Sequence, residues 1–319
     1  WCAMLRDGTD CAQFRGNDRM ARYVTVASVS LRPEGDMDRR VEQAAHFAWR
    51  AKQLGADILA FPETYVHTGL GEAKDLAEVL PGPSTARLAE AAKTHAMYIV
   101  WPLYERRGGT LYNSAVLIDR RGQIAGVYRK MHPTIGEIES RILPGEDTPT
   151  FETDFGRVGM AICFDLNFRD IMTGLAESGA EVIFFCSAYR GGMQVRYWAF
   201  ELGVYMVSSI LAEGGQIVDL TGTVLEQSTY ESLITRRINL NRRLLHMDYN
   251  WDKMDKMLEK YGGALTFDYV TPEACYAVGC TREGLSIDAV LDEFGLERRR
   301  DYFERANRVR AEALAAATR

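Results

Sequence analysis

The chain has 319 residues, enough for one large domain or two smaller ones with a sizeable buried core. Its formal net charge of -6 gives no electrostatic reason to expect a nucleic acid or an anionic membrane surface as partner, and no apolar run approaches the length of a membrane span. Its 6 cysteines are too few for a disulfide framework and favour a reducing, cytoplasmic location.

The amino-terminal part begins with an unpatterned segment and continues with two regular elements. Residues 1–19 show no clean periodicity and lack the apolar core of a signal peptide, so we interpret them as a leader or as a segment added to the natural sequence. Residues 23–30 alternate apolar and polar side chains and predict a strand. Residues 36–54 carry an apolar face at helical spacing and predict an amphipathic helix.

Two of the next predicted strands end in charged side chains. An apolar strand over residues 57–61 is stopped by Pro62, and the carboxylate of Glu63 follows at once. A helix is then predicted over residues 85–95, followed by strands over 97–103, 111–118 and 124–129. The last of these strands runs directly into the cation Lys130.

A cysteine follows another predicted strand in the middle of the chain. Residues 159–162 are small or apolar and read as a buried strand, and Cys163 comes directly after them, before a helical pattern that ends near Gly179. The positive end of a helix dipole favours the thiolate form of such a cysteine. The alternative is a structural cysteine, since free cysteines are among the most buried residues. Further on, we predict a strand over 181–186, a helix over 194–202, and strands over 204–209, 216–219 and 233–238.

A carboxylate, an ammonium group and a thiol therefore each follow the carboxyl end of a predicted strand. In open sheets, ligands bind outside those ends, so the three side chains converge if their strands are neighbours. In that arrangement Glu63 accepts the thiol proton, Cys163 attacks a carbonyl carbon, and Lys130 stabilises the oxyanion.

The same three stretches resemble the signature motifs of the nitrilase superfamily of carbon–nitrogen hydrolases, in order and in spacing. They are Phe61-Pro62-Glu63, Tyr128-Arg129-Lys130 and Gly159-Met160-Ala161-Ile162-Cys163-Phe164-Asp165. The similarity extends over about residues 23–240. It implies a four-layer α-β-β-α sandwich, a Glu-Lys-Cys catalytic set, and hydrolysis through a thioester acyl-enzyme that needs neither metal nor organic cofactor. We therefore divide the chain into residues 1–19, a carbon–nitrogen hydrolase domain over 20–241, and an extension over 242–319.

The resemblance also implies a second glutamate between the lysine and the cysteine, which orients the lysine and the substrate. Two carboxylates in the loop after Lys130 are candidates, and Glu139 fits the family spacing better than Glu137. The alternative is that both are solvated loop carboxylates. His132 invites a Cys–His dyad, but a histidine recurs there in similar proteins without acting as the base, so we disfavour that hypothesis.

The substrate class is predicted from the residues around the nucleophile. Nitrile hydrolases of the superfamily usually carry Trp-Glu after the cysteine, whereas Phe164-Asp165 resembles the amide and carbamoyl branches. Phe164 and Tyr189 are candidate substrate-binding residues. Arg169 is a candidate ligand for a substrate carboxylate, or else pairs structurally with Asp165, Asp170 or a loop glutamate.

We therefore predict hydrolysis of a small-molecule amide or N-carbamoyl compound. The alternatives are nitrile hydrolysis by the same cysteine, a soluble N-acyltransferase, and a catalytically silent scaffold. In residues 242–319 we expect helices over 251–261, 287–294 and 299–316. This extension is interpreted either as an arm that contacts a partner subunit or as a solvated appendage. A homodimer or larger homo-oligomer is expected, with neither nucleic acid nor membrane as partner.

Overall fold

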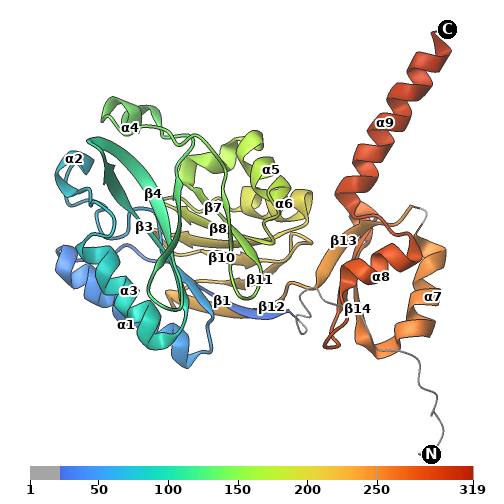
Figure 1. The fold of residues 1–319 in the computed structure, drawn as a ribbon, viewed down its shortest axis with the longest axis horizontal. Helices are drawn as coiled ribbons and strands as arrows, with labels where there is room; N and C mark the ends of the chain where they lie inside the picture. Colours follow the sequence, from blue (N-terminus) through green and yellow to red (C-terminus); the bar gives the residue numbers. More distant parts are fainter. Residues whose placement is uncertain (1–21, 249, 319) are drawn as a thin grey trace, which may run out of the picture.

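The computed structural model describes residues 22–248 and 250–318, which form a large sandwich and a smaller carboxyl-terminal unit beside it (Figure 1). The leader predicted for residues 1–19 lies outside the described residues.

The sandwich contains two six-stranded sheets. The first has the order β12-β1-β2-β3-β4-β5 and the second the order β11-β10-β9-β8-β7-β6. The strands of the first sheet are β1 (Tyr23–Val29), β2 (Ile58–Ala60), β3 (Tyr98–Arg107), β4 (Thr110–Ile118), β5 (Ile124–Arg129) and β12 (Leu233–Asn239). Those of the second are β6 (Thr150–Glu152), β7 (Arg157–Ile162), β8 (Val182–Ser187), β9 (Tyr205–Ile210), β10 (Gln216–Val218) and β11 (Val224–Gln227).

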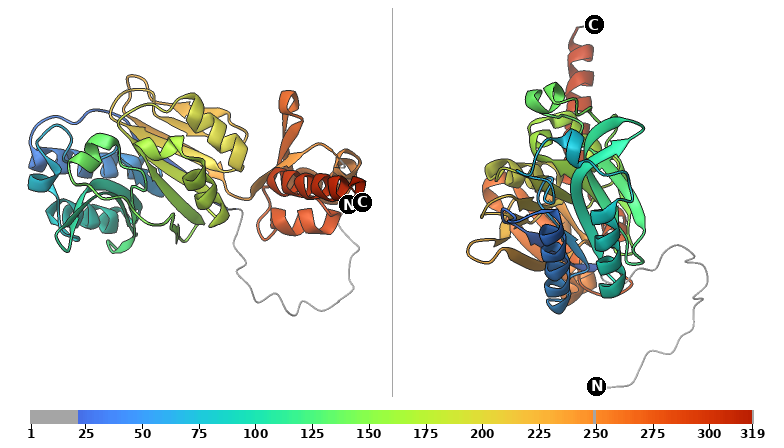
Figure 2. Two further views of the ribbon diagram at one scale, coloured as in Figure 1. Left: turned by 90° about the horizontal axis from the view of Figure 1, so that it is seen from above. Right: turned by 90° about the vertical axis from the view of Figure 1, so that its left-hand side faces the viewer.

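Helices cover the outer face of each sheet (Figures 1 and 2). The helices α1 (Met37–Gln53) and α3 (Pro83–His95) pack on the first sheet, and α5 (Arg169–Glu177) and α6 (Met193–Leu202) pack on the second. Two shorter helices, α2 (Ala73–Leu76) and α4 (Ile135–Glu139), lie in loops. The result is the α-β-β-α sandwich that the sequence predicted, with nearly every predicted strand and helix of this part in place.

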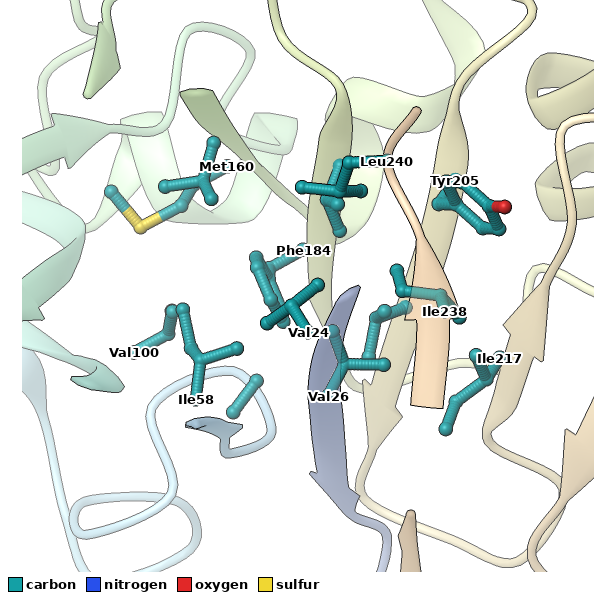
Figure 3. Packing of buried hydrophobic residues seen from close by; sticks show 14 of the residues in the cluster. Val24, Val26, Ile58, Val100, Met160, Phe184, Tyr205, Ile217, Ile238 and Leu240 are labelled. Atoms are coloured by element: carbon teal, nitrogen blue, oxygen red, sulfur yellow. The ribbon is translucent and has the colours of Figure 1, made fainter. Parts of the chain in front are cut away.

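The two sheets meet through alternate residues of their strands, because successive side chains of a strand point to opposite faces. Val24 and Val26 of β1 face Met160 and Phe184 of the second sheet in one buried cluster, as Figure 3 shows. Phe185 of β8 points the other way and packs under α5 and α6. This pattern explains why the central strands read as continuous apolar runs: both of their faces are buried.

Strand direction decides where the functional side chains lie. The strands β1, β2 and β3 are parallel, and so are β7, β8 and β9. The strand β5 is antiparallel to β4, which is antiparallel to β3, so β5 runs in the same direction as β2 and β3. The segments that follow β2 and β5 therefore leave the first sheet at one edge, and those that follow β7, β8 and β9 leave the second sheet at one edge.

The carboxyl-terminal unit has its own sheet, which corrects the expectation of a purely helical extension. Its strands, in the order β13-β15-β14, are β13 (Arg242–His246), β14 (Leu265–Val270) and β15 (Cys275–Cys280). The predicted helices are present as α7 (Trp251–Tyr261), α8 (Ile287–Phe294) and α9 (Arg299–Ala317). This three-stranded sheet, α7 and α8 pack around a separate apolar core that includes Leu245, Met257 and Val278. The strands were missed because each is short and gains its stability from pairing with segments distant in sequence.

The helix α9 extends away from the rest of the molecule in Figure 1 and in the right-hand view of Figure 2. None of its residues is buried. Within the described part of the chain, no helix combines the length and the apolar character needed to cross a membrane.

Candidate active site

Glu63, Lys130 and Cys163, which follow three different strands, meet between the two sheets. The Nζ atom of Lys130 donates a hydrogen bond to Oε1 of Glu63 over 2.8 Å, and the Cys163 thiol interacts with the same carboxylate. Glu63 and Lys130 are almost fully buried, with exposed fractions of 6% and 1%. The convergence that the sequence predicted is therefore present in the structure.

The backbone is strained at two positions in this cluster. Cys163 has a φ of 48°, and Thr64, which follows Glu63 directly, has a φ of 43°. Residues with a side chain rarely adopt positive φ values, and such strain persists only where the surroundings enforce it. Asp165 supplies part of that enforcement at Cys163: it is fully buried and accepts hydrogen bonds from the backbone N–H of Ile162 and from the Tyr128 hydroxyl, over 2.9 and 2.6 Å. The nucleophile turn is thus tied to the strand that delivers Lys130.

The Cys163 thiol is protonated at rest, contrary to the expectation that a helix dipole favours its thiolate. Burial and the negative charge of Glu63 raise the thiol pKa to about 12, despite the opposing influence of Lys130 and of the Ala188 backbone N–H. The dipole contributes little, because the cysteine opens a five-residue 3₁₀ turn (Cys163–Asn167) and α5 begins only at Arg169. Attack by this sulfur therefore requires a base that removes its proton.

The Lys130 ammonium is held in its charged form. Burial alone would lower its pKa, but the Glu63 and Glu137 carboxylates outweigh burial and raise the pKa above its ordinary value. Nζ donates to Oε2 of Glu137 over 2.7 Å in addition to its bond with Glu63. A fixed cation thus lies beside the thiol.

The second carboxylate at the lysine is Glu137, not the predicted Glu139. Thr134 caps α4 in a reciprocal capping box, in which the Glu137 side chain returns to the Thr134 backbone N–H over 2.8 Å. This bond turns the Glu137 carboxylate toward Lys130. Glu139 lies two residues further along the helix, on a different face, and is exposed. Sequence spacing alone favoured Glu139 because it did not reveal the capped helix.

Asn113 on β4 is a site residue to which the sequence analysis gave no role. Its Nδ2 atom donates to Oε1 of Glu63 over 2.9 Å and to Oε1 of Glu137 over 2.8 Å, and the side chain is buried. The amide therefore holds the two glutamates around Lys130. Its backbone carbonyl accepts from the Lys130 N–H, so the sheet register itself sets this contact.

The two oxygens of Glu63 have different partners. Oε1 accepts from Lys130 and Asn113, whereas Oε2 accepts from the backbone N–H of Ala188 over 3.1 Å. Ala188 is exposed and opens the segment after β8, so the cluster reaches solvent on this side. Oε2 is the oxygen with room for a further proton.

Two of the predicted substrate-binding residues, Phe164 and Tyr189, lie at the cluster, and the disfavoured base His132 lies nearby. Phe164 is 36% exposed beside the nucleophile and packs edge-to-face on Phe168, with ring centroids 5.1 Å apart. The Tyr189 hydroxyl donates to the Cys163 carbonyl over 3.3 Å, so Tyr189 lies at the cluster. His132 stacks on Phe168 with centroids 3.7 Å apart, a position suited to packing rather than to the role of base.

Arg169 points away from the cluster toward α6. Its guanidinium donates to the Tyr197 hydroxyl over 3.0 Å, lies 3.5 Å from a Glu201 oxygen, and covers the Trp198 ring. The structural ion pair weighed as the alternative is therefore the observed one, although its partner is Glu201 and not Asp165, Asp170 or a loop glutamate. The reason is helix phase: Arg169 is the first residue of α5 and faces the neighbouring helix.

Groups suited to hold a metal ion are absent from the described part of the chain, in which no three His, Cys, Asp or Glu side chains cluster for that purpose. The cluster offers instead an acid–base carboxylate, a protonated thiol and a cation. These are the groups that acyl transfer through a covalent intermediate requires.

Known proteins resemble this chain over the part that forms the sandwich. Residues 25–243 match the carbon–nitrogen hydrolase family. Among curated proteins, the human omega-amidase NIT2 is 30% identical over 183 residues, which cover 54% of this chain and 66% of that protein. The beta-ureidopropionase of Arabidopsis thaliana is 35% identical over 156 residues, covering 45% of this chain and 38% of that protein. The chain thus spans slightly less than two thirds of the human relative.

Among solved structures, Saccharomyces cerevisiae Nit3, a member of branch 10 of the nitrilase superfamily, superimposes with a TM-score of 0.64. Its sequence is 22% identical, and the superposition covers 69% of this chain and 91% of that structure. This likeness confirms the fold.

Proposed function

Because the chain belongs to the carbon–nitrogen hydrolase family, we propose that it is an amidase-type thiol hydrolase that cleaves a small amide or N-carbamoyl compound. The observation that carries the proposal is the buried contact of Glu63 with both Lys130 and the protonated Cys163. Omega-amidase and beta-ureidopropionase, the names of two relatives, support this substrate class.

In the first step, Glu63 acts as general base. A thiol whose pKa is raised to about 12 is almost wholly protonated near neutral pH, so its proton has to leave as the sulfur attacks. Oε2 of Glu63 is the acceptor that the hydrogen-bond pattern favours, since Oε1 already accepts from Lys130 and Asn113. The sulfur then adds to the carbonyl carbon of the substrate.

In the second step, the negative charge of the tetrahedral intermediate is stabilised. The Lys130 ammonium lies beside the thiol and is held in place by two carboxylates, so it meets the developing oxyanion without reorganisation. The backbone N–H of Phe164 is proposed as the second donor. Glu63 returns its proton to the departing nitrogen, and ammonia or an amine leaves a thioester on Cys163.

In the last step, water hydrolyses the thioester. Glu63 takes a proton from the water, the resulting oxygen adds to the thioester carbon, and Cys163 leaves and recovers its proton. Atoms and charges balance over the cycle: one amide and one water give one carboxylic acid and one amine or ammonia. Glu137 and Asn113 hold Lys130 and Glu63 in place throughout.

The test is an assay of the purified protein on matched amide, N-carbamoyl and nitrile compounds, with ammonia release as readout. We expect turnover of the amide or carbamoyl compound, and its abolition in Cys163→Ala and Glu63→Gln. Intact-mass measurement after rapid quenching should show the acyl adduct on the wild-type protein and not on Cys163→Ala. A clear preference for the nitrile, or full activity in Cys163→Ala, would reject the proposal.

A soluble N-acyltransferase is the alternative that the same cluster permits, since an amine in place of water would take the acyl group. Adding amines to the assay and analysing the products separates the two. A catalytically silent scaffold would leave the thiol without an acyl adduct under any of these conditions.

We also propose that the protein works as a homodimer or larger homo-oligomer in a reducing, cytoplasmic setting. The support for assembly is α9, a helix of 19 residues with none buried, because an isolated helix gains most of its stability from packing. The support for the setting is the free thiol that the mechanism requires. Sedimentation that shows only monomer at micromolar concentration would reject the first part, and fractionation of the native host cells tests the second.

A further inference from the structure

Tyr104 of β3 lies beside the cluster of reactive groups and has no role in the mechanism proposed above. It is paired in register with Asn113 of β4, and cross-strand partners of an antiparallel pair lie on the same face of the sheet. Asn113 donates to Oε1 of Glu63, so Tyr104 is the direct neighbour of a residue that holds the proposed base. The Tyr104 side chain is half-buried.

The Tyr104 hydroxyl lies among the charged groups of the cluster. It makes a hydrogen-bonding contact with the Thr64 side chain. Burial and, after it, the negative charges of Glu63 and Glu137 raise the pKa of the phenol, so the hydroxyl is close to both carboxylates. A phenol whose pKa is raised stays neutral near neutral pH and keeps its proton for hydrogen bonding.

A closed set of contacts fastens the segment after Glu63 to Tyr104. The Thr64 carbonyl accepts from the His67 backbone N–H over 2.9 Å, and Nδ1 of His67 accepts from the Tyr104 backbone N–H over 3.0 Å. The His67 and Tyr104 rings stack with an interplanar angle of 1° and centroids 5.6 Å apart. The Tyr104 ring also packs against a small apolar cluster formed by Ala73, Leu111 and Ile142. Its hydroxyl then returns to the Thr64 side chain, which closes the loop.

Thr64 requires such a restraint. Its φ of 43° lies in the left-handed region, where a β-branched residue is strained, and such a conformation persists only where the surrounding structure enforces it. His67 holds the backbone of Thr64, whereas Tyr104 holds its side chain. Because Thr64 follows Glu63 directly, the direction of the Glu63 side chain depends on this turn.

We propose that Tyr104 is a positioning residue for the general base: its hydroxyl holds Thr64 in the left-handed conformation and thereby keeps Glu63 directed at the Cys163 thiol. This inference rests on the proposed function, in which Glu63 takes the thiol proton. It gives Tyr104 no contact with the substrate. The ring supplies rigidity and the hydroxyl supplies the restraint, so substitution can separate the two contributions.

The experiment removes the hydroxyl and keeps the ring. In Tyr104→Phe, kcat for the amide or N-carbamoyl compound that the protein turns over best should fall about fivefold, with KM unchanged. That loss is typical of one neutral hydrogen bond. A pH titration of thiolate absorbance should also show the thiol pKa of Cys163 falling below about 12, because Glu63, which helps to raise it, is no longer held against the thiol. Thermal unfolding measured in parallel verifies folding.

Variants of Thr64 test the path by which Tyr104 acts. Thr64→Ala removes the partner of the Tyr104 hydroxyl and should cost as much kcat as Tyr104→Phe does. Thr64→Ser, which keeps a hydroxyl, should recover most of that loss. The double variant Tyr104→Phe/Thr64→Ala should be no slower than either single variant, because both substitutions remove the same contact. Losses that multiply in the double variant would overturn the proposal.

The control is Tyr112→Phe, which removes the hydroxyl of another half-buried tyrosine. Tyr112 precedes Asn113 on β4, so its side chain points to the opposite face of the sheet, where its ring lies against the Arg129 guanidinium. Phenylalanine keeps that contact. Tyr112→Phe should leave kcat and the thiol pKa of Cys163 as in the wild type.

The remaining outcomes separate the proposal from its rivals. A raised KM with unchanged kcat in Tyr104→Phe would assign the tyrosine to substrate binding and overturn the proposal. An unchanged thiol pKa in folded Tyr104→Phe would overturn it as well. If the wild type turns over neither an amide nor an N-carbamoyl compound, the proposed function fails, and the thiol titration alone still decides whether Tyr104 positions Glu63.

Discussion

The position of Glu137 gives the sharpest test of how the catalytic cluster is held together. Its carboxylate accepts from Lys130 over 2.7 Å, from Asn113 over 2.8 Å and from the Thr134 backbone N–H over 2.8 Å. In Glu137→Gln one oxygen becomes an NH₂ donor, so at least one of these donors loses its acceptor. The Lys130 ammonium then donates to one carboxylate, that of Glu63, instead of two.

The expected cost follows from the charge-assisted bond to Lys130. Such a bond contributes about 1.5–3 kcal/mol in mutational series, so a loss of about 2 kcal/mol, or ~30-fold, is expected in kcat. The KM for a simple amide should change little, because Glu137 touches Lys130 and Asn113 rather than the space beside Cys163. That division between kcat and KM distinguishes positioning of the lysine from binding of substrate.

The assay is steady-state ammonia release at saturating amide, with thermal unfolding measured in parallel to verify folding. Glu139→Gln is the matched control: it lies two residues away in the same short helix and is exposed, so its kcat should stay within about twofold of the wild type. Equal damage from the two substitutions, or a folded Glu137→Gln protein with more than half of the wild-type kcat, would refute the reasoning.

Three further outcomes are expected. In Glu63→Gln the thiol pKa of Cys163 should fall below its wild-type value of about 12, because the carboxylate that helps to raise it is gone. A pH titration followed by thiolate absorbance near 240 nm measures the pKa. An unchanged titration midpoint would contradict the prediction. Burial, aided by Arg40, lowers the pKa of His67 to about 4. As the pH falls, His67 therefore takes up a proton in the unfolded chain at a higher pH than in the folded one. The free energy of unfolding should drop by about 2 kcal/mol from pH 7 to pH 5. Urea unfolding should show this drop in the wild type and in exposed His46→Asn but not in His67→Asn. Arg169→Gln should leave kcat/KM unchanged for the amide or N-carbamoyl compound that the protein turns over best, and a tenfold loss would restore the role in substrate binding that the sequence suggested.

The convergence of Glu63, Lys130 and Cys163 was predictable because each residue follows a predicted strand. The apolar runs before Glu63 and Cys163 are buried on both faces and therefore stand out in the sequence. Parallel pairing then brings the ends of such strands to one edge, so their order along the chain carries spatial information.

The choice between Glu137 and Glu139 depended on a five-residue helix that periodicity cannot detect. The usable signal was Thr134 followed three residues later by Glu137, the pattern of a capping box. The raised thiol pKa of Cys163 was also not predictable from the sequence, because it depends on burial and on Glu63, which lies 100 positions earlier in the chain. The sequence left two roles open for Arg169, substrate binding and a structural ion pair, because the direction of its side chain is set by the packing of α5 on α6.

The proposed catalytic cluster draws its members from both sheets, and this has a consequence for how the protein folds. Glu63 and Lys130 leave the first sheet, whereas Cys163 leaves the second. Either sheet alone, even with all its strands paired, holds an incomplete set of reactive groups. During refolding from denaturant, recovery of enzymatic activity should therefore lag behind recovery of the circular dichroism signal and coincide with exclusion of water from the layer around Phe184. Turnover thus serves as an intrinsic reporter of the moment when the two halves of the sandwich dock.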